Sequence, residues 1–335
     1  MALTIQVLGQ PGRDNALFVK VDTGQHITRL LFDCGDGCPH ALSYRDVIEI
    51  DHLFFSHLHM DHVGGFDAFF RPNHDRTLRP NHIWGPADTA AILHHRFRGF
   101  LWNLLADAEP VSWHIHDIHP GEIRTTRFDL REAFETAHAE GSRDWNRVIL
   151  EGTGVVVEAH LMNHGTPSVA YVVRESERVN VDTARLAATG FSPGPWVKRL
   201  RGPRAAPGEM VEVGGIDRDL VALQDELLIT TPGESVAYLT DFRMDAAARD
   251  YLAAHLRGVD TVICESQYQA ADRDLAERNW HMAADEVALM AAAAGVGRLI
   301  LFHLSDRYQP DGWREILAEA RSIFANTQLP EGWAF

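Results

Sequence analysis

The sequence predicts a mixed α/β protein in which β-sheets are covered by helices. The chain has 335 residues, which is enough for two ordinary domains or one large layered domain. Its residues are 45% hydrophobic and 23% charged, a composition that suits a folded core and argues against disorder. Strand-like and helical segments also alternate without strict βαβ order, which favours sheets with helices packed on them.

The first half contains short apolar runs separated by turn-forming residues. Residues 46–56 rise into an apolar run and break at SHLHMDHVGG, so we expect a strand that feeds a histidine-rich loop and then a helix at FDAFF. Other strands are predicted at 3–9, 16–22, 27–35, 82–86, 111–118, 154–164 and 168–174, and helical spacing at 89–106.

Residues 176–234 differ from the rest of the chain. They are rich in Gly and Pro and have weak periodicity, so we expect an inserted, flexible arm that leaves the compact body. Alternation then resumes, with strands expected at 235–241, 259–266 and 298–304 and helices at 244–256, 282–294 and 311–325.

The charge of the chain limits its partners. Acidic residues outnumber basic ones by 47 to 31, and the net charge is −16. A protein this acidic does not bind nucleic acid through its overall field, so an RNA would need a local basic patch. Residues 185–208 provide one, because they contain five basic residues and no acidic one. These five are Arg185, Lys198, Arg199, Arg201 and Arg204.

Two further absences narrow the class of protein. The chain has neither a basic leader nor an apolar run of the roughly 18 residues that span a bilayer, so we expect a soluble, cytoplasmic protein without a membrane partner. Its three cysteines, Cys34, Cys38 and Cys264, cannot form a disulfide framework, and no second pair completes a metal site with the first two. We expect buried thiols.

A dense group of metal-binding residue types follows the apolar run at 46–56. His57, His59, Asp61 and His62 lie within six residues. One tetrahedral zinc is poorly served by four ligands so close together, whereas two neighbouring metal ions can share them. The motif therefore predicts a two-metal site.

Other candidate ligands occur at the ends of predicted strands. His164 precedes the strand at 168–174, Asp241 ends the strand at 235–241, and His303 lies in RLILFHLSDRY. Strand ends present side chains from a fixed scaffold, and a carboxylate can bridge two cations through its two oxygens. Together with the motif, these residues give seven candidate ligands. In contrast, His114, His116 and His119 are expected to form an exposed strand face without a metal.

Several motifs, in this order, resemble the metallo-β-lactamase fold hydrolases, and more narrowly the ribonuclease Z family of transfer-RNA 3′ processing endonucleases. They are LFDCGDG (31–37), the histidine motif, LMNHGTPSVAYVV, TARLAATGFSPGPWVKRLRG (183–202), TDFR (240–243), CES (264–266) and LFHLSDRY (301–308). The resemblance implies a single four-layer αββα sandwich over residues 1–335, with residues 176–234 as an inserted, exosite-like arm. It also implies a homodimer.

The resemblance further implies a dinuclear zinc centre, with Mn²⁺ or Fe²⁺ as alternative metals. One metal would be held by His57, His59 and His164, and the other by Asp61, His62 and His303. Asp241 would bridge them. Water between two cations would be the nucleophile, and Asp61 would serve both as ligand and as part of the catalytic group.

His281 would protonate the leaving 3′-oxygen, and Glu265 would orient it. The family has Ser-Thr after this histidine, whereas this chain has Met282-Ala283 and lacks both hydroxyls. Arg307 and Tyr308 would grip a phosphate or an acceptor base.

In the arm, Lys198, Arg199 and Arg201 would bind RNA. The function expected is therefore cleavage of precursor transfer RNA at its 3′ end. The alternative is hydrolysis of a small phosphodiester, such as a cyclic nucleotide or nucleotide-derived diester, with the same metals. Hydrolysis of a carbon ester, thioester or lactone is a third reading, and metal binding without catalysis a fourth.

Overall fold

The computed structural model describes residues 3–24, 26–105 and 108–333. The chain divides into two units: one of residues 1–175 and 234–335, and a smaller one of residues 176–233. Among the described residues, no helix is both long and apolar enough to cross a membrane.

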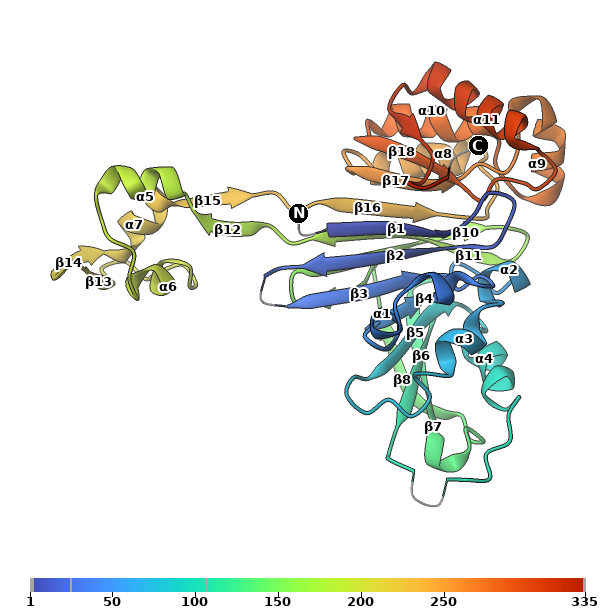
Figure 1. Ribbon diagram of the computed structural model, residues 1–335, viewed down its shortest axis with the longest axis horizontal. Helices are drawn as coiled ribbons and strands as arrows, with labels where there is room; N and C mark the ends of the chain where they lie inside the picture. Colours follow the sequence, from blue (N-terminus) through green and yellow to red (C-terminus); the bar gives the residue numbers. More distant parts are fainter. Residues whose placement is uncertain (1–2, 25, 106–107, 334–335) are drawn as a thin grey trace. The chain divides into compact units, whose positions relative to one another are not determined.

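The larger unit contains two stacked β-sheets with helices on their outer faces (Figure 1). The first sheet has eight strands in sequence order, so each strand pairs with its neighbours in the chain. The strands are β1 (Leu3–Gly9), β2 (Asn15–Asp22), β3 (Ile27–Phe32), β4 (His52–Phe54), β5 (Asn81–Pro86), β6 (Ser112–His119), β7 (Glu122–Asp129) and β8 (His138–Asp144). With them come the helices α1 (Tyr44–Ile48), α2 (Met60–Val63), α3 (Phe66–Phe70) and α4 (Thr89–Phe97), and the short 3₁₀ turns η1 (Cys38–Ala41) and η2 (Leu130–Glu132).

The second sheet has seven strands in the order β19-β18-β17-β16-β11-β10-β9. Strands β16 to β19 pair in parallel, whereas β9, β10, β11 and β16 pair antiparallel. The strands are β9 (Val148–Gly152), β10 (Val155–Asn163), β11 (Pro167–Glu175), β16 (Ser235–Leu239), β17 (Thr261–Glu265), β18 (Arg298–Phe302) and β19 (Thr327–Gln328). The helices are α8 (Ala246–His255), α9 (Arg273–Asn279), α10 (Ala284–Ala294) and α11 (Pro310–Ile323), with the turn η3 (Ala270–Asp272).

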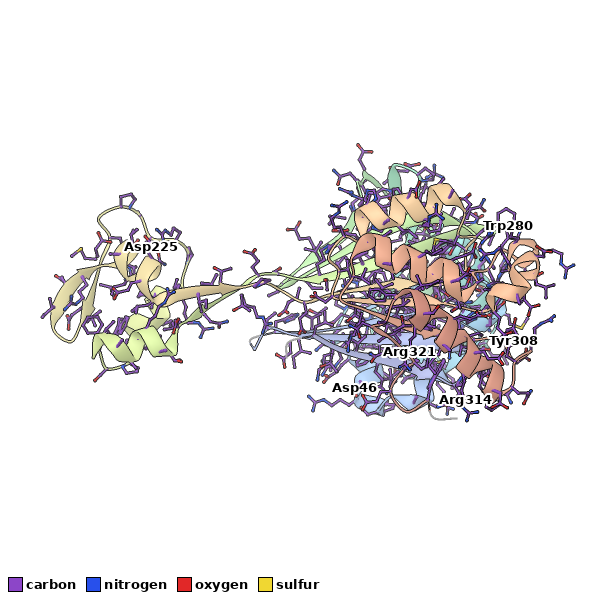
Figure 2. The ribbon with its side chains drawn as sticks, turned by 90° about the horizontal axis from the view of Figure 1, so that it is seen from above. Asp46, Asp225, Trp280, Tyr308, Arg314 and Arg321 are labelled. Carbon is purple, nitrogen blue, oxygen red and sulfur yellow. The ribbon has the colours of Figure 1, made fainter. Side chains whose placement is uncertain are left out.

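Apolar side chains fill the space between the sheets and the space under the helices. Phe32 and Phe54 of the first sheet stack at 4.8 Å between ring centroids, and Tyr171 and Tyr238 of the second sheet pack against Phe32. A separate cluster lies beneath α3 and α4 on the other face of the first sheet. In α11, Ile316 is buried. Arg314, on the same helix, faces solvent (Figure 2). The fold class predicted from the sequence is confirmed, with four layers in the order αββα.

The topology gathers several loops at one edge of the sandwich. Strands β3 to β6 run parallel to one another, as do β16 to β18, so their carboxyl ends share an edge within each sheet. The segments that follow β4, β10, β16 and β18 carry the candidate metal ligands, and Glu265 ends β17 at the same edge. The three cysteines are free and buried in the described structure, as expected.

The smaller unit contains more secondary structure than its composition predicts. It has the helices α5 (Thr183–Thr189), α6 (Trp196–Leu200) and α7 (Leu220–Leu227), and the strand pairs β12 (Arg178–Val181) with β15 (Leu228–Thr231) and β13 (Met210–Val213) with β14 (Ile216–Asp219). Trp196, Leu200, Leu223 and Leu227 belong to its own apolar cluster. These elements are too short for sequence periodicity to reveal them.

Some segments of the larger unit differ from the sequence prediction. Residues 46–48 belong to α1 and not to the strand, because Ser43 caps this helix by accepting a hydrogen bond from the Asp46 N–H. The helix predicted at 89–106 ends at Phe97, and residue 106 lies outside the described residues. Strands β7 to β9 went unpredicted because β8 is exposed along most of its length and shows no apolar alternation.

A row of histidines crosses β4, β5 and β6. His52 lies opposite His82, and His82 lies opposite His114. His82 Nδ1 is 3.0 Å from His116 Nε2, and His114 is within 2.7 Å of the Glu140 carboxylate. His116 is buried, which contradicts the exposed strand face expected for it. Its ring stacks at 3.9 Å on Trp84, and this packing covers it.

Burial lowers the pKa of His52 to about 4, of His82 to about 3 and of His116 to about 2. In the unfolded chain the pKa of each of these histidines is about 6.5. Above that pH both states are neutral, and below it the unfolded chain takes up protons that the folded chain does not. The cluster therefore lowers stability progressively as the pH falls below that value.

We expect His82→Gln to remove the part of this loss of stability at low pH that His82 causes. Relative to wild type, the variant should gain about 1 kcal/mol in free energy of unfolding between pH 7 and pH 5, measured by urea denaturation. His95→Gln, a change at an exposed histidine of α4, is the control and should leave the pH dependence unchanged. Parallel curves for His82→Gln and wild type would contradict the prediction.

Candidate metal centre

Backbone hydrogen bonds from both sheets hold the histidine motif in place. The Phe55 N–H donates to the Trp84 carbonyl at 2.7 Å, and the Val169 N–H donates to the Ser56 carbonyl at 2.8 Å. The chain then turns into α2, and Gly65, which follows this helix, packs so closely that a Cβ atom would lie 2.3 Å from the Gly35 carbonyl oxygen. The motif therefore sits on rigid backbone and not on a free loop.

His57, His59 and His164 form a first group, in which one ligand atom from each lies within 4.8 Å of the others. The His57 ring is 4.5 Å from that of His59 and 4.9 Å from that of His164, between centroids. His164 follows β10, and its Nδ1–H donates to the Trp280 carbonyl at 2.7 Å. Gly165 completes the turn with φ +72°, a conformation that side chains disfavour.

Asp61, His62, Asp241 and His303 form a second group with the same spacing. His62 Nε2 is 3.2 Å from Asp241 Oδ2 and 3.4 Å from Asp61 Oδ2. His303 lies 3.3 Å from both carboxylates. Asp241 also faces the first group, because its Oδ2 is 3.9 Å from Nε2 of both His57 and His164. The structure thus brings all seven predicted ligands together, with Asp241 between the groups.

The orientation of the imidazoles fits divalent metal ions. His57 Nδ1 lies 3.1 Å from the Ser56 hydroxyl, whose own proton goes to a carboxylate, so this ring donates outward through Nδ1. His57 Nε2 is buried and has no hydrogen-bond partner among the described residues. Burial lowers the pKa of His57 to about 2, so the ring is neutral, which is the form that coordinates metals. His164 donates outward in the same way and directs Nε2 inward.

The arrangement of charges in the second group requires a proton or a cation. His62 donates through Nδ1 to Asp33, which leaves its Nε2 lone pair facing the oxygens of Asp61 and Asp241. A lone pair beside carboxylates is repulsive unless a proton or a cation lies between them. Although burial opposes it, contacts with His303 and His62 hold the pKa of Asp241 well below its usual range. The site therefore favours bound positive charge.

Asp33 orients this group and went unpredicted as a site residue. It is fully buried and has φ 57°. Its Oδ2 accepts hydrogen bonds from His62 Nδ1 at 2.8 Å, the Ser56 hydroxyl at 2.7 Å and the Tyr238 hydroxyl at 2.9 Å. Its Oδ1 accepts from the Ser56 N–H at 2.7 Å. The available signal was an acidic residue at the end of an apolar strand, where an unpaired carboxylate is costly.

His281 and Glu265 lie beside the metal ligands. Glu265 ends β17 and is completely buried, and its two oxygens are 3.1 and 3.2 Å from His281 Nδ1. His281 Nδ1 is also 3.8 Å from Asp241. Burial lowers the pKa of His281, but the Glu265 and Asp241 carboxylates outweigh it and raise the pKa to about 9. In the protein as described, the imidazole is therefore protonated at neutral pH.

The two residues after His281 have an apolar role in this chain. Met282 and Ala283 are completely buried. The Ala283 N–H donates to the Glu286 side chain at 3.1 Å, so the start of α10 is capped without a hydroxyl. Packing and this carboxylate compensate for the missing Ser and Thr at the helix start.

The predicted substrate-binding residues lie in different places. Arg307 is exposed a few residues after His303. The Tyr308 hydroxyl contacts the Asp272 carboxylate and accepts from the Gln269 N–H, so its polar group has partners within the protein. Lys198, Arg199 and Arg201 belong to the smaller unit.

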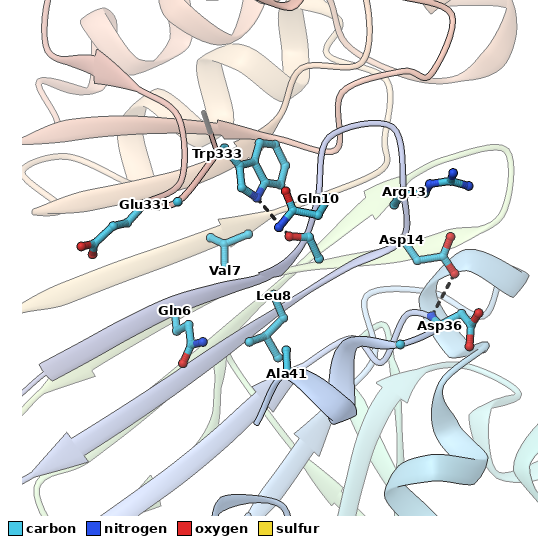
Figure 3. A pocket seen from close by; sticks show the side chains of 13 residues that line it. Gln6, Val7, Leu8, Gln10, Arg13, Asp14, Asp36, Ala41, Glu331 and Trp333 are labelled. Carbon is cyan, nitrogen blue, oxygen red and sulfur yellow. Dashed lines mark hydrogen bonds between the residues drawn. The ribbon is translucent and has the colours of Figure 1, made fainter. Parts of the chain in front are cut away.

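Two hollows adjoin the loop that contains Gly12, Arg13 and Asp14. One of about 160 Å³ is lined by Asp61 and His303 as well as by this loop. The other, of about 550 Å³, lies between the loop and Trp333, whose indole N–H donates to the Gly9 carbonyl at 3.0 Å (Figure 3). Asp14 accepts a hydrogen bond from the Asp36 N–H at 2.9 Å and holds the loop against the turn at 34–37.

The sandwich and its convergent histidines and carboxylates define a metal-dependent hydrolase of the metallo-β-lactamase fold. Solved structures share this fold: the metallo-beta-lactamase fold protein YhfI from Bacillus subtilis has a TM-score of 0.57 at 14% identity and covers 99% of this chain and 97% of its own. Human tRNase Z, short form, has a TM-score of 0.56 at 16% identity, covering 98% and 97%.

Sequence comparison identifies the family. Ribonuclease Z of Deinococcus radiodurans is 46% identical over 331 residues, which cover 99% of this chain and 98% of the relative. Ribonuclease Z of Brevibacillus brevis is 29% identical over 310 residues, covering 90% and 84%. The chain belongs to the ribonuclease Z family. A family profile described as Anti-Pycsar protein Apyc1 also matches residues 13–162.

We expect Asp33→Asn to weaken metal binding, because the amide cannot accept all the hydrogen bonds that orient His62. Loss of such an outer partner typically lowers metal affinity by about 10- to 100-fold. The measurement is metal content per chain after dialysis against a graded chelator. Asp36→Asn changes an exposed carboxylate of the same turn and should retain the metal. Equal metal retention by both variants would contradict the role given to Asp33.

Proposed function

We propose that the protein is a dinuclear zinc phosphodiesterase that cleaves precursor transfer RNA at its 3′ end. The observation that carries this proposal is Asp241, which lies between two groups of ligand side chains and beside the His281–Glu265 pair. Membership of the ribonuclease Z family supports the choice of substrate. The proposal includes a homodimer, for which the molecular mass in solution is the measurement.

The residues would hold two zinc ions as their grouping suggests, with Mn²⁺ or Fe²⁺ as alternative metals. His57, His59 and His164 would hold one ion, and Asp61, His62 and His303 the other, with Asp241 shared. Bound there, the ions supply a nucleophile at neutral pH by lowering the pKa of water and neutralise charge on the phosphate.

The position of His281 beside the ligand groups suits a proton donor. Its Nδ1 is held by Glu265, so the ring has a fixed orientation beside the ligand groups. A cleaved RNA strand departs as an alkoxide, which needs a proton, whereas a nitrophenolate leaving group does not. General acid catalysis contributes about 10²- to 10⁴-fold in such steps. We assign His281 the protonation of the leaving 3′-oxygen and Glu265 its orientation.

The smaller unit offers a limited cationic surface for RNA. Its residues 176–233 include eight acidic and seven basic residues, so the basic segment at 185–208 is balanced by acids around it. Arg185, Arg199 and Arg204 form ion pairs with acidic residues. Lys198 and Arg201 are exposed, and the described residues provide no ion pair for either. These two side chains are the better candidates for phosphate contacts.

The first test compares precursor transfer RNA carrying a 3′ trailer with bis(p-nitrophenyl) phosphate, both with zinc supplied. Wild type should cleave both substrates. Asp241→Ala should abolish both activities, because it removes the carboxylate shared by the ligand groups. Lys198→Glu with Arg201→Glu should lower RNA cleavage by about tenfold or more, since two phosphate contacts become repulsive, and spare the small diester.

Other outcomes of this comparison would overturn parts of the proposal. RNA cleavage that survives Asp241→Ala would refute the metal site. Turnover of the small diester alone by wild type would favour a phosphodiesterase of small nucleotides. Equal loss of both activities on charge reversal would give the arm a structural role.

We expect His281→Ala to separate substrates by leaving group. RNA cleavage should fall by about 10²- to 10⁴-fold, because the alkoxide then departs without its proton. Hydrolysis of bis(p-nitrophenyl) phosphate should change by less than about threefold, because nitrophenolate leaves unprotonated. His95→Ala, a change at an exposed histidine of α4, serves as the control. An equal loss on both substrates would show that His281 supports the site and does not donate a proton.

A further inference from the structure

A hollow of about 480 Å³ lies in the larger unit, apart from the metal ligands. Its lining includes two aromatic residues, an arginine and an asparagine, and it contains no carboxylate. The lining side chains used below are Trp145, Asn146, Arg147, Ala159, Leu161 and Tyr251.

The topology places this hollow at the edge of the sandwich that carries the candidate metal centre. Ala159 and Leu161 lie on β10, which ends at Asn163, directly before His164. Three strand residues span about 10 Å, so Leu161 is that far along the strand from the ligand. The end of β8 leads into Trp145, and Glu122 pairs with Asp144 at the turn that follows β6. A long substrate held at the ligands can therefore reach the hollow.

Arg147 is the unusual residue of this hollow. It is exposed, and no ion pair is formed by its side chain in the described parts of a chain with net charge −16. Its backbone has φ 79°, in the left-handed region that favours glycine or asparagine. The Arg147 carbonyl accepts a hydrogen bond from the Ala159 N–H at 2.8 Å, which ties it to β10. A strained position occupied by an unpaired cation points to a role for the guanidinium.

The two aromatic residues beside it are fixed by hydrogen bonds. The Trp145 indole N–H donates to the His119 carbonyl at 2.8 Å. The Tyr251 hydroxyl lies 2.9 Å from His160 Nδ1, and 38% of Tyr251 remains exposed. Fixed aromatic rings with an arginine nearby are the means by which proteins hold unpaired nucleotides, since bases stack on rings and guanidinium binds phosphate.

We propose that this hollow binds an unpaired nucleotide that flanks the scissile phosphodiester, with Arg147 on its phosphate and Trp145 and Tyr251 beside its base. The inference rests on the proposed function, because it requires an RNA substrate longer than the bond that is cut. It assigns to the edge of β10 a specificity role that is separate from the metal ligands and from the smaller unit.

The test uses Arg147→Gly in the full-length, metal-loaded enzyme. Glycine removes the guanidinium and suits the left-handed backbone, so the fold should be as stable as wild type or more so. The matched control is Arg257→Ala. Arg257 is exposed between α8 and β17, at the opposite edge, and is likewise without an ion pair in the described structure. Thermal unfolding of each variant establishes that it is folded.

Substrates are a series of RNA strands extended stepwise on either side of the cleavage site, and bis(p-nitrophenyl) phosphate. Wild type should gain in kcat/KM when the strand is extended on one side. In Arg147→Gly, this gain in kcat/KM should be about tenfold smaller than in wild type, because a charged hydrogen bond to phosphate is lost. The change should appear mainly in KM. It should hydrolyse the small diester as wild type does, and Arg257→Ala should match wild type throughout.

Two results would overturn the inference. One is an extension gain that Arg147→Gly retains in full, and the other is an equal loss on the small diester, which would indicate a structural effect. If wild type cleaves no RNA, the proposed function fails. Fluorescence anisotropy with a labelled single-stranded RNA then decides the inference by itself: weaker binding to Arg147→Gly than to Arg257→Ala supports it, and equal binding refutes it.

Discussion

The carboxylate of Asp33 is the interaction on which the site depends. A buried carboxylate without partners costs several kcal/mol, so its four hydrogen bonds must all be present when the chain is folded. Their donors come from the loop after β4, from α2, and from Tyr238 on the opposite sheet. The sheets must therefore stack in one register before His62 and His57 take their orientations. Packing of the sandwich and the geometry of the metal centre are in this way a single requirement.

Acidic residues lie both on the surface and within the candidate metal centre. Most of the acidic excess lies on the surface, but three carboxylates, Asp33, Asp241 and Glu265, are buried among histidines. They make the centre favourable for cations, and Glu265 and Asp241 raise the pKa of His281. Metal ions that bind only the folded chain add their binding free energy to its stability. The candidate ligand His303 and the orienting residue Asp33 both have left-handed backbone, so some strain is retained at the site.

The sequence was sufficient for the fold class and for the grouping of ligands, because four candidate ligands are adjacent in the chain and the others follow apolar strands. It could not reveal Asp33 as a shared acceptor, since one of its donors, Tyr238, lies 205 residues away from it in the chain. The hollow at Arg147 joins residues from four separate segments, and no local pattern marks it. Residues 176–233 looked like a long loop because helices of five to eight residues give too few repeats to show a period. Substrate contact by Tyr308 stays a prediction from the motif, and the structure adds that its hydroxyl has partners within the protein.

The smaller unit is inserted between two strands that pair directly with each other. Strands β11 and β16 pair directly, with Arg174 opposite Ser235, and the Glu175 N–H donates to the Glu234 carbonyl at 2.9 Å. The whole insertion therefore begins and ends at one rung of a hairpin that a short turn could close equally well. Because closing a longer loop costs little more entropy than closing a short one, such a position tolerates gain, loss or exchange of a module. In evolutionary terms, the range of substrates served by this scaffold can change without altering the ligands of the metal centre.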